Sequence, residues 1–272
     1  MGLGEMFRTA TVLIAALGLM GAAPSDVRQL DPENTLVIDT TKGRIVVELR
    51  PEFAPQAVAR IKLLAREKVY DGLQFHRVID GFVAQTGNPN NRDGGVSAHP
   101  DLPPEFSFRI PTETATMVVE RSDGREGFVG ATPFAAVSAT EQRLSPDTRL
   151  RGWGAYCPGV MGMGRQADPG TANSEIFFMR AASRRLDHDY TVVGRAVVGL
   201  EVLRAVSVGE PPPVPDLMLR VRVAADMPAA ERPDLRAQDP RGPAFQARIA
   251  ALKQSKAADF TVCDLEISPP RR

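Results

Sequence analysis

The chain has 272 residues, of which 43% are hydrophobic and 24% are charged, so it is long enough to bury a large core and has an ordinary globular composition. Its 33 basic and 33 acidic side chains cancel, and no basic stripe stands out. We therefore expect no nucleic-acid partner. Glycine and proline, 23 of each, indicate many turns and short strands rather than a helical bundle.

An apolar run lies close to the N-terminus. Residues 9–23 are uncharged and end in small side chains. The run is shorter than the roughly 18 residues that span a bilayer as a helix, and it is typical of the hydrophobic region of a secretory signal. We predict that residues 1–23 are a signal peptide cleaved near Ala22 or Ala23, that the protein is exported to the periplasm or secreted, and that no membrane span remains after cleavage. A short buried core helix is the alternative interpretation.

The next elements are predicted to be a hairpin followed by a helix. Residues 36–40 and 44–49 are rich in β-branched side chains and flank the turn signal Thr-Lys-Gly. Residues 51–70 then change to a helical period, with Pro55 in a first-turn position. Later in the chain we predict strands at 159–164, 175–179, 191–195 and 217–224, and a second helix at 199–206.

Residues 75–89, with the sequence FHRVIDGFVAQTGNP, predict two short strands around a glycine turn. They place Arg77 and Gln85 close to two phenylalanines. An arginine buried among aromatic rings is unfavourable unless something uses its charge, whereas an isolated arginine on a strand is more often a surface side chain. The histidines lie too far apart in sequence to predict a metal site, and Gly162-x-Gly164 lacks the Gly-Lys-Ser/Thr of a phosphate loop, so we expect no cofactor and no metal ion.

The string at 75–89 resembles the signature of the cyclophilins, which are prolyl-peptide cis–trans isomerases. Two later blocks, residues 159–178 and 186–194, resemble further blocks of that family and follow in the same order. The resemblance implies a mainly β fold over residues 34–226, a closed antiparallel cyclophilin-like β-barrel capped by two helices. It also implies that the partners are proline-containing polypeptide substrates, and we expect a monomer.

The chemistry of this family explains why an arginine matters. Rotation about an X-Pro bond has a barrier of about 18–20 kcal/mol and requires no nucleophile, metal or proton relay. It requires a pocket for the proline ring and a donor that favours the twisted amide over either planar form. A guanidinium stays charged and donates several hydrogen bonds at fixed angles. Arg77 is therefore the predicted catalytic residue.

The resemblance also assigns the substrate-binding residues. Phe82 and Phe178 would line the proline pocket, and Gln85 would bind the substrate backbone and hold the guanidinium in place. The other positions implied by the resemblance are Val83, Met163, Gly164, Arg165, Leu186 and Tyr190.

The chain departs from the family pattern at three positions. Arg185 stands where the family commonly has Trp, Tyr190 where it commonly has His, and Arg165 where it commonly has Asn. The arginine and the apolar pocket are kept, but the peptide groove is altered. A peptide-binding or chaperone module with little or no turnover is therefore an alternative to the enzyme. A secreted hydrolase is a second alternative, which the absence of a nucleophile–base motif disfavours.

Two segments fall outside the resemblance. Residues 109–156 are an insertion with polar turn signals, which we expect to lie beside the substrate groove because both of its ends adjoin groove-forming blocks. Residues 227–272 are a C-terminal extension. Within it we predict a proline-rich linker at 228–243, a helix at 244–257 with Phe245, Ile249 and Leu252 on one face, and a strand at 259–267.

The two cysteines, Cys157 and Cys263, are the last feature that the sequence offers. In an oxidising compartment they can pair and connect the extension to the body of the protein. Closing a loop of roughly 100 residues contributes on the order of 4–5 kcal/mol in the chain-entropy estimate. Two buried free thiols are the alternative, and neither cysteine belongs to a Cys-x-x-Cys redox motif.

Overall fold

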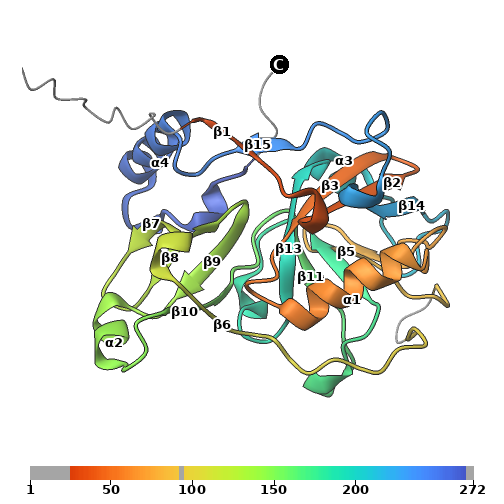
Figure 1. Cartoon of the computed structure of the whole chain (residues 1–272), viewed down its shortest axis with the longest axis horizontal. Coiled ribbons are helices and arrows are strands. Elements are labelled where there is room, and N and C mark those ends of the chain that lie inside the picture. The colour runs from red at the N-terminus through yellow and green to blue at the C-terminus, as the bar shows by residue number, and fades with distance from the viewer. Residues whose placement is uncertain (1–24, 92–94, 268–272) are drawn as a thin grey trace, which may run out of the picture.

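The computed structural model describes residues 25–91 and 95–267 (Figure 1). The predicted signal peptide, residues 1–23, lies outside the described residues. In the part of the chain that the structure describes, none of the helices combines the length and the apolar character needed to cross a membrane.

The main body is an eight-stranded antiparallel sheet with the order β14-β2-β3-β13-β11-β12-β5-β4. The predicted hairpin and the later strands are confirmed, with boundaries shifted by one to three residues. The strands are β2 (Thr35–Thr40), β3 (Gly43–Leu49), β4 (Arg77–Ile79), β5 (Val83–Thr86), β11 (Val160–Met163), β12 (Ile176–Met179), β13 (Val192–Val198) and β14 (Met218–Val223).

The sheet curls, but it does not close into a barrel by a continuous ladder, which corrects the prediction of a closed barrel. The edge strands β4 and β14 do not pair with each other directly. The contacts between the two edges are made by residues that precede β4 and residues at the start of β14. Gln74 forms an isolated bridge with Leu217, and the Met218 amide donates to the Leu73 carbonyl at 2.8 Å. The two edges of the curled sheet are therefore joined by a few isolated backbone hydrogen bonds and not by a continuous strand pairing.

Both predicted helices of this body are present, as α1 (Pro55–Arg66) and α3 (Leu200–Ala205). Proline begins α1, where its missing N–H leaves no hydrogen bond unmade. The apolar face of α1 is buried together with the inner face of the sheet. This inner core contains Ile38, Ile45, Val58, Ile61, Phe75, Met161, Met163 and Phe178, among others.

The insertion folds into a second antiparallel sheet with the order β6-β10-β9-β8-β7. Figure 1 shows this sheet beside the main body. The two sheets share one core, in which the rings of Phe53 and Phe108 stack with centroids 4.0 Å apart. Its elements are β6 (Phe108–Ile110), β7 (Thr116–Glu120), β8 (Arg125–Val129), β9 (Thr132–Ala136), α2 (Ala139–Leu144) and β10 (Leu150–Gly154).

The C-terminal extension packs on the insertion. The predicted helix is confirmed as α4 (Pro243–Lys256), which buries Phe245 and Ile249. The segment predicted to be a linker contains a strand, β15 (Arg236–Gln238), which pairs with β1 (Val27–Gln29). The N-terminal strand, the insertion and the extension thus lie together on one side of the main body (Figure 1).

The prediction of a strand at 259–267 is wrong. This segment forms short 3-10 turns, because the Asp264 carboxylate accepts a hydrogen bond from the Thr261 amide at 2.8 Å and so bends the backbone. The 3-10 turns within the described residues are Pro32–Asn34, Thr112–Thr114, Pro169–Thr171, Arg184–Leu186, Ala224–Asp226, Ala257–Asp259 and Val262–Asp264.

Cys157 and Cys263 form a disulfide bond, so the predicted pairing is confirmed. Their Cα atoms lie 4.9 Å apart, and the bond joins residues separated by 106 positions in sequence. It connects the C-terminal extension to the end of the insertion, directly before β11.

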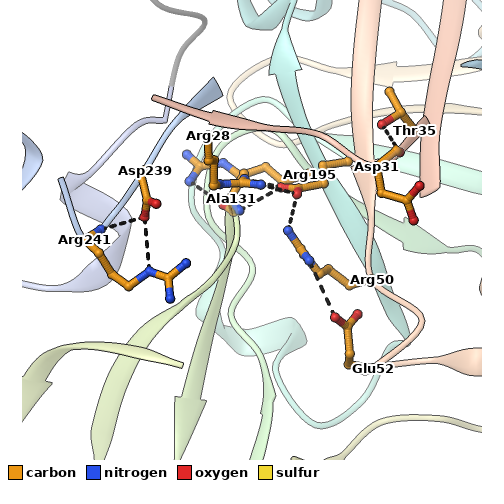
Figure 2. A network of polar contacts seen from close by, with 10 residues as sticks. Arg28, Asp31, Thr35, Arg50, Glu52, Ala131, Arg195, Asp239 and Arg241 are labelled. Atoms are coloured by element: carbon orange, nitrogen blue, oxygen red, sulfur yellow. Dashed lines mark hydrogen bonds and ion pairs between the residues drawn. The ribbon is translucent and has the colours of Figure 1, made fainter. Parts of the chain in front are cut away.

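A buried carboxylate, Glu48 on β3, joins the N-terminal strand and the insertion to the main body. Figure 2 labels its partners Arg28, Arg50 and Ala131. Arg28 of β1 donates to its Oε1 atom at 2.5 Å, and the Ala131 amide donates to its Oε2 atom at 2.8 Å. Arg50 forms an ion pair with the same carboxylate. Gly130 has a φ of +55°, and a Cβ atom there would collide with the Arg50 guanidinium.

Arg195 of β13 lies beside this cluster and is 1% exposed. Its guanidinium donates to the carbonyl oxygens of Pro158 at 3.0 Å, Ala131 at 3.4 Å and Leu265 at 3.3 Å. Burial lowers the pKa of Arg195 to about 10. The main body, the insertion and the C-terminal extension therefore meet at one buried side chain.

Replacing the carboxylate, as in Glu48→Gln, is expected to lower the free energy of unfolding at neutral pH by about 3–5 kcal/mol, because two guanidiniums then lose their buried counter-charge. Urea unfolding measures this change. Glu141→Gln, which removes an exposed carboxylate of the insertion, is the matched control and should change stability little.

The stability difference between wild type and Glu48→Gln is expected to depend on pH. Burial alone would raise the pKa of Glu48, but Arg50, Arg28 and the Ala131 amide lower it below its usual 4.5. The stabilisation is therefore fully present above pH 4.5 and is lost as the pH falls through the lowered pKa. The stability difference between wild type and Glu48→Gln should shrink in acid, and a constant difference would contradict this assignment.

Candidate active site

A cavity of about 570 Å³ opens on the face of the curled sheet opposite to its inner core. Strands β4, β5 and β12 place their outward side chains there, because Arg77 is the register partner of Gln85 and Gln85 is the partner of Phe177. Residues 184–190, which we call the groove loop, form the opposite side. The predicted site residues that line the cavity are Arg77, Phe82, Val83, Gln85, Gly164, Arg165, Leu186 and Tyr190.

Two predicted site residues lie elsewhere. Phe178 is fully buried in the inner core and pairs with Ala84, so its neighbour Phe177 is the ring that lines the cavity. Met163 is 1% exposed and also belongs to the inner core, whereas Gly164 does reach the cavity. Both corrections have one cause. The predicted residue lies one position away from the residue that lines the cavity, and neighbouring residues of a strand point to opposite faces of the sheet.

The Arg77 guanidinium is held by two side chains. Its Nη1 atom donates to Gln85 Oε1 at 2.9 Å, and its Nε atom donates to Glu210 Oε2 at 2.7 Å. Within residues 25–91 and 95–267, the Nη2 atom has no hydrogen-bond partner. An oriented donor thus remains available at the edge of the cavity.

Glu175 fixes the orientation of Gln85 and was missed by the sequence reasoning. This buried carboxylate accepts a hydrogen bond from Gln85 Nε2, and His76 Nε2 lies 3.1 Å from the same oxygen. A Cβ atom on Gly164 would lie 2.8 Å from the Glu175 side chain, so glycine is required for this close approach. The chain of contacts from His76 to Arg77 leaves the guanidinium little rotational freedom.

The apolar part of the cavity is a group of aromatic rings. Phe177 stacks on Tyr156 with centroids 5.6 Å apart and meets Tyr190 edge-on at 5.8 Å. A Cβ atom on Gly162 would lie 2.6 Å from the Phe177 ring. Burial raises the pKa of Tyr156 well above its usual value, and nearby Asp187 acts in the same direction. A proline ring would find an apolar, largely preformed surface here.

Arg165 and Arg185 occupy the rim of this cavity. The Arg165 guanidinium lies 4.4 Å from the centre of the Tyr190 ring and pairs with Asp189 at 2.7 Å. Arg165 is therefore folded against the groove loop. Arg185 lies over the Phe82 ring, 4.8 Å from its centre, and is exposed.

The insertion holds the groove loop, and the C-terminal extension in turn contacts the insertion at the same residue, Glu126. Arg184 donates to Glu126 of β8 at 2.7 Å and to Asp187 at 2.6 Å. The Tyr156 amide donates to Asp187 at 3.0 Å, and the Val262 amide of the extension donates to Glu126 at 2.8 Å. Burial raises the pKa of Asp187 above its usual 3.8, although the charge of Arg184 opposes that shift.

Residues 109–156, expected beside the groove, contact it through this loop and through Tyr156, which stacks on the pocket ring Phe177. Trp153 packs on His188 of the groove loop, with ring centroids 3.7 Å apart. Among the described residues that line the cavity, none belongs to the insertion. The insertion thus supports one side of the groove without providing its surface.

The geometry can be compared with known proteins. Residues 35–223 match the family model described as cyclophilin type peptidyl-prolyl cis-trans isomerase/CLD. The chain belongs to the cyclophilin family. Two curated relatives of this cyclophilin are a "Probable peptidyl-prolyl cis-trans isomerase" of Brucella suis and "Peptidyl-prolyl cis-trans isomerase ppi1" of Schizosaccharomyces pombe. The Brucella protein is 32% identical, and the match covers 82% of this chain and 98% of that protein. The Schizosaccharomyces protein is 30% identical, and the match covers 61% of this chain and 81% of that protein.

A solved structure extends the similarity beyond the family domain. Cyclophilin AquaCyp293 from Hirschia baltica is 33% identical, with a TM-score of 0.80, and the match covers 89% of this chain and 92% of that one. The covered share is longer than residues 35–223, so the likeness includes part of the added segments. This cyclophilin is accordingly an enzyme of the peptidyl-prolyl cis-trans isomerase class.

Glu126→Gln tests the support of the groove loop from the insertion. The change weakens a hydrogen bond to the charged Arg184, so the loop should hold Leu186 and Tyr190 less firmly. We expect KM for a proline peptide to rise by about tenfold, in keeping with a lost bond of on the order of 1.5 kcal/mol, with little change in kcat. An unchanged KM in a folded Glu126→Gln protein would refute the role, and Glu141→Gln is the control.

Proposed function

We propose that this cyclophilin accelerates the rotation of X-Pro peptide bonds in exported proteins, with Arg77 as its catalytic residue. The observation that carries the proposal is an oriented guanidinium at the edge of an aromatic pocket, whose Nη2 atom has no hydrogen-bond partner among the described residues. The substrates would be proline-containing polypeptides in extended conformation.

The mechanism follows from the electronic structure of the amide. Twisting the X-Pro bond breaks its conjugation and localises a lone pair on the prolyl nitrogen. A hydrogen bond from Arg77 to that nitrogen is stronger in the twisted form than in either planar form, so it lowers the barrier. No bond is made or broken covalently and no proton is transferred. Phe82, Phe177 and Leu186 would bind the ring, keeping it still while the preceding carbonyl rotates.

The second contribution is preorganisation. Gln85 accepts from Arg77 and donates to Glu175, which itself contacts His76, so the donor is positioned before substrate arrives. A fixed charge near a poorly hydrated surface needs little reorganisation during the reaction. Gln85 also has the groups needed to bind the substrate backbone.

Export is the second half of the proposal. It is supported by the uncharged run at 9–23, and the Cys157–Cys263 bond suits an oxidising compartment. The clients would then be proteins that fold outside the cytoplasm, in the periplasm or after secretion.

A peptide-binding module with slow turnover is the alternative. Arg185 covers part of the Phe82 ring, which reduces the apolar surface open to a proline side chain. Such a module would retain peptide affinity and lack rate acceleration. A single assay of turnover separates the two functions.

The expected result is that wild type accelerates isomerisation of a short X-Pro peptide in a protease-coupled assay, and that Arg77→Ala lowers kcat/KM by about 10²-fold or more. Arg241→Ala, which truncates an exposed arginine of the extension, controls for loss of charge. No acceleration by wild type would favour the binding module. Full activity in Arg77→Ala would show that another residue acts on the amide.

A further inference from the structure

The three arginines that line the pocket differ in what neutralises them. Arg77 pairs with Glu210 at 2.7 Å, and Arg165 pairs with Asp189 at 2.7 Å. For Arg185, the described residues supply no hydrogen bond and no ion pair, only the face of the Phe82 ring. One full positive charge at the mouth of the pocket is thus left without a counter-charge from the described residues.

The position of Arg185 places this charge next to a bound peptide. Its guanidinium lies 4.8 Å from the centre of the Phe82 ring, and its neighbour Leu186 also lines the pocket. A proline ring that contacts these two apolar side chains brings its flanking residues to the rim. Contact with the ring face leaves the N–H groups at the edge of the guanidinium free to donate to a carboxylate.

The described side chains that line the pocket offer no unpaired carboxylate to a basic substrate. Among the described residues lining the cavity, the single carboxylate is that of Glu175, which is buried and engaged by Gln85 and His76. Since Glu210 and Asp189 neutralise the other two arginines, the local field is positive next to Arg185. An acidic side chain beside the proline would be attracted, and a basic one would be repelled.

We infer that Arg185 is a specificity-determining residue, and that this cyclophilin favours proline segments with an aspartate or glutamate directly flanking the proline. The inference rests on the proposed function insofar as it uses the same pocket. It adds the chemical class of the substrate, which the Arg77 chemistry alone leaves undefined.

The test uses matched short peptides with Glu, Gln or Lys immediately before the proline, and a second set with the change immediately after it. Titrations followed by NMR give Kd, and exchange spectroscopy on the same samples gives the isomerisation rate. In at least one set, at low ionic strength, the Glu peptide should bind about two- to fivefold more tightly than the Gln peptide, with Lys weakest. The ratio should fall as salt is added.

Variants assign the preference to one side chain. Arg185→Gln should bring the Glu-to-Gln affinity ratio close to one, and Arg185→Lys should keep part of it. Arg241→Gln removes an equal charge from the extension and should leave the ratio unchanged. A ratio near one in both wild-type sets, or a ratio that survives Arg185→Gln, would overturn the inference. Missing turnover with an intact affinity ratio would overturn the isomerase proposal and support the recognition of acidic segments.

Discussion

One buried carboxylate holds the added segments on the curled sheet. Glu48 accepts hydrogen bonds from Arg28 of the N-terminal strand and from the amide of Ala131 in the insertion. Arg50, which directly follows β3, forms an ion pair with the same carboxylate. Charges removed from water are tolerated only when they are paired and hydrogen-bonded, so these segments can dock in one arrangement. That docking matters for the active site, because the insertion contacts the groove loop through Glu126, in addition to the contacts that Arg165 and Phe177 of the main body make with it.

The active site therefore has two parts with different origins. The curled sheet provides the guanidinium of Arg77 and its positioning contacts. The groove loop provides the residues that face a flanking peptide, and its conformation depends on Glu126 and on Tyr156, which stacks on the pocket ring Phe177. Tyr156 directly precedes Cys157, so the disulfide bond connects the extension to the chain immediately beside the pocket. In the proposed function, reaction chemistry and recognition of the flanking peptide are consequently supported by different regions of the protein.

The sequence was sufficient for the strands and both helices of the main body and for most of the site, since these depend on local patterns and on a specific motif. The prediction from sequence failed where the local pattern does not show which face a side chain points to or how the backbone bends. Ile176–Met179 is apolar at every position because β12 is buried on both faces, so alternation could not distinguish Phe177 from Phe178. The alternation at 259–267 suggested a strand, but the bond from Thr261 to Asp264 bends it into a turn. Partners distant in sequence, such as Glu126 with Arg184, leave no local signal.

The central claim is that Arg77 acts on the twisted amide and contributes little to binding the planar one. NMR exchange spectroscopy on a proline peptide saturated with protein measures the rotation rate on the enzyme, while a titration of the same peptide gives Kd. For Arg77→Ala, the rate on the enzyme should fall by about 10²-fold and Kd should stay within about twofold of wild type. A weakened Kd with an unchanged rate on the enzyme would contradict the claim, because Arg77 would then be a binding residue only.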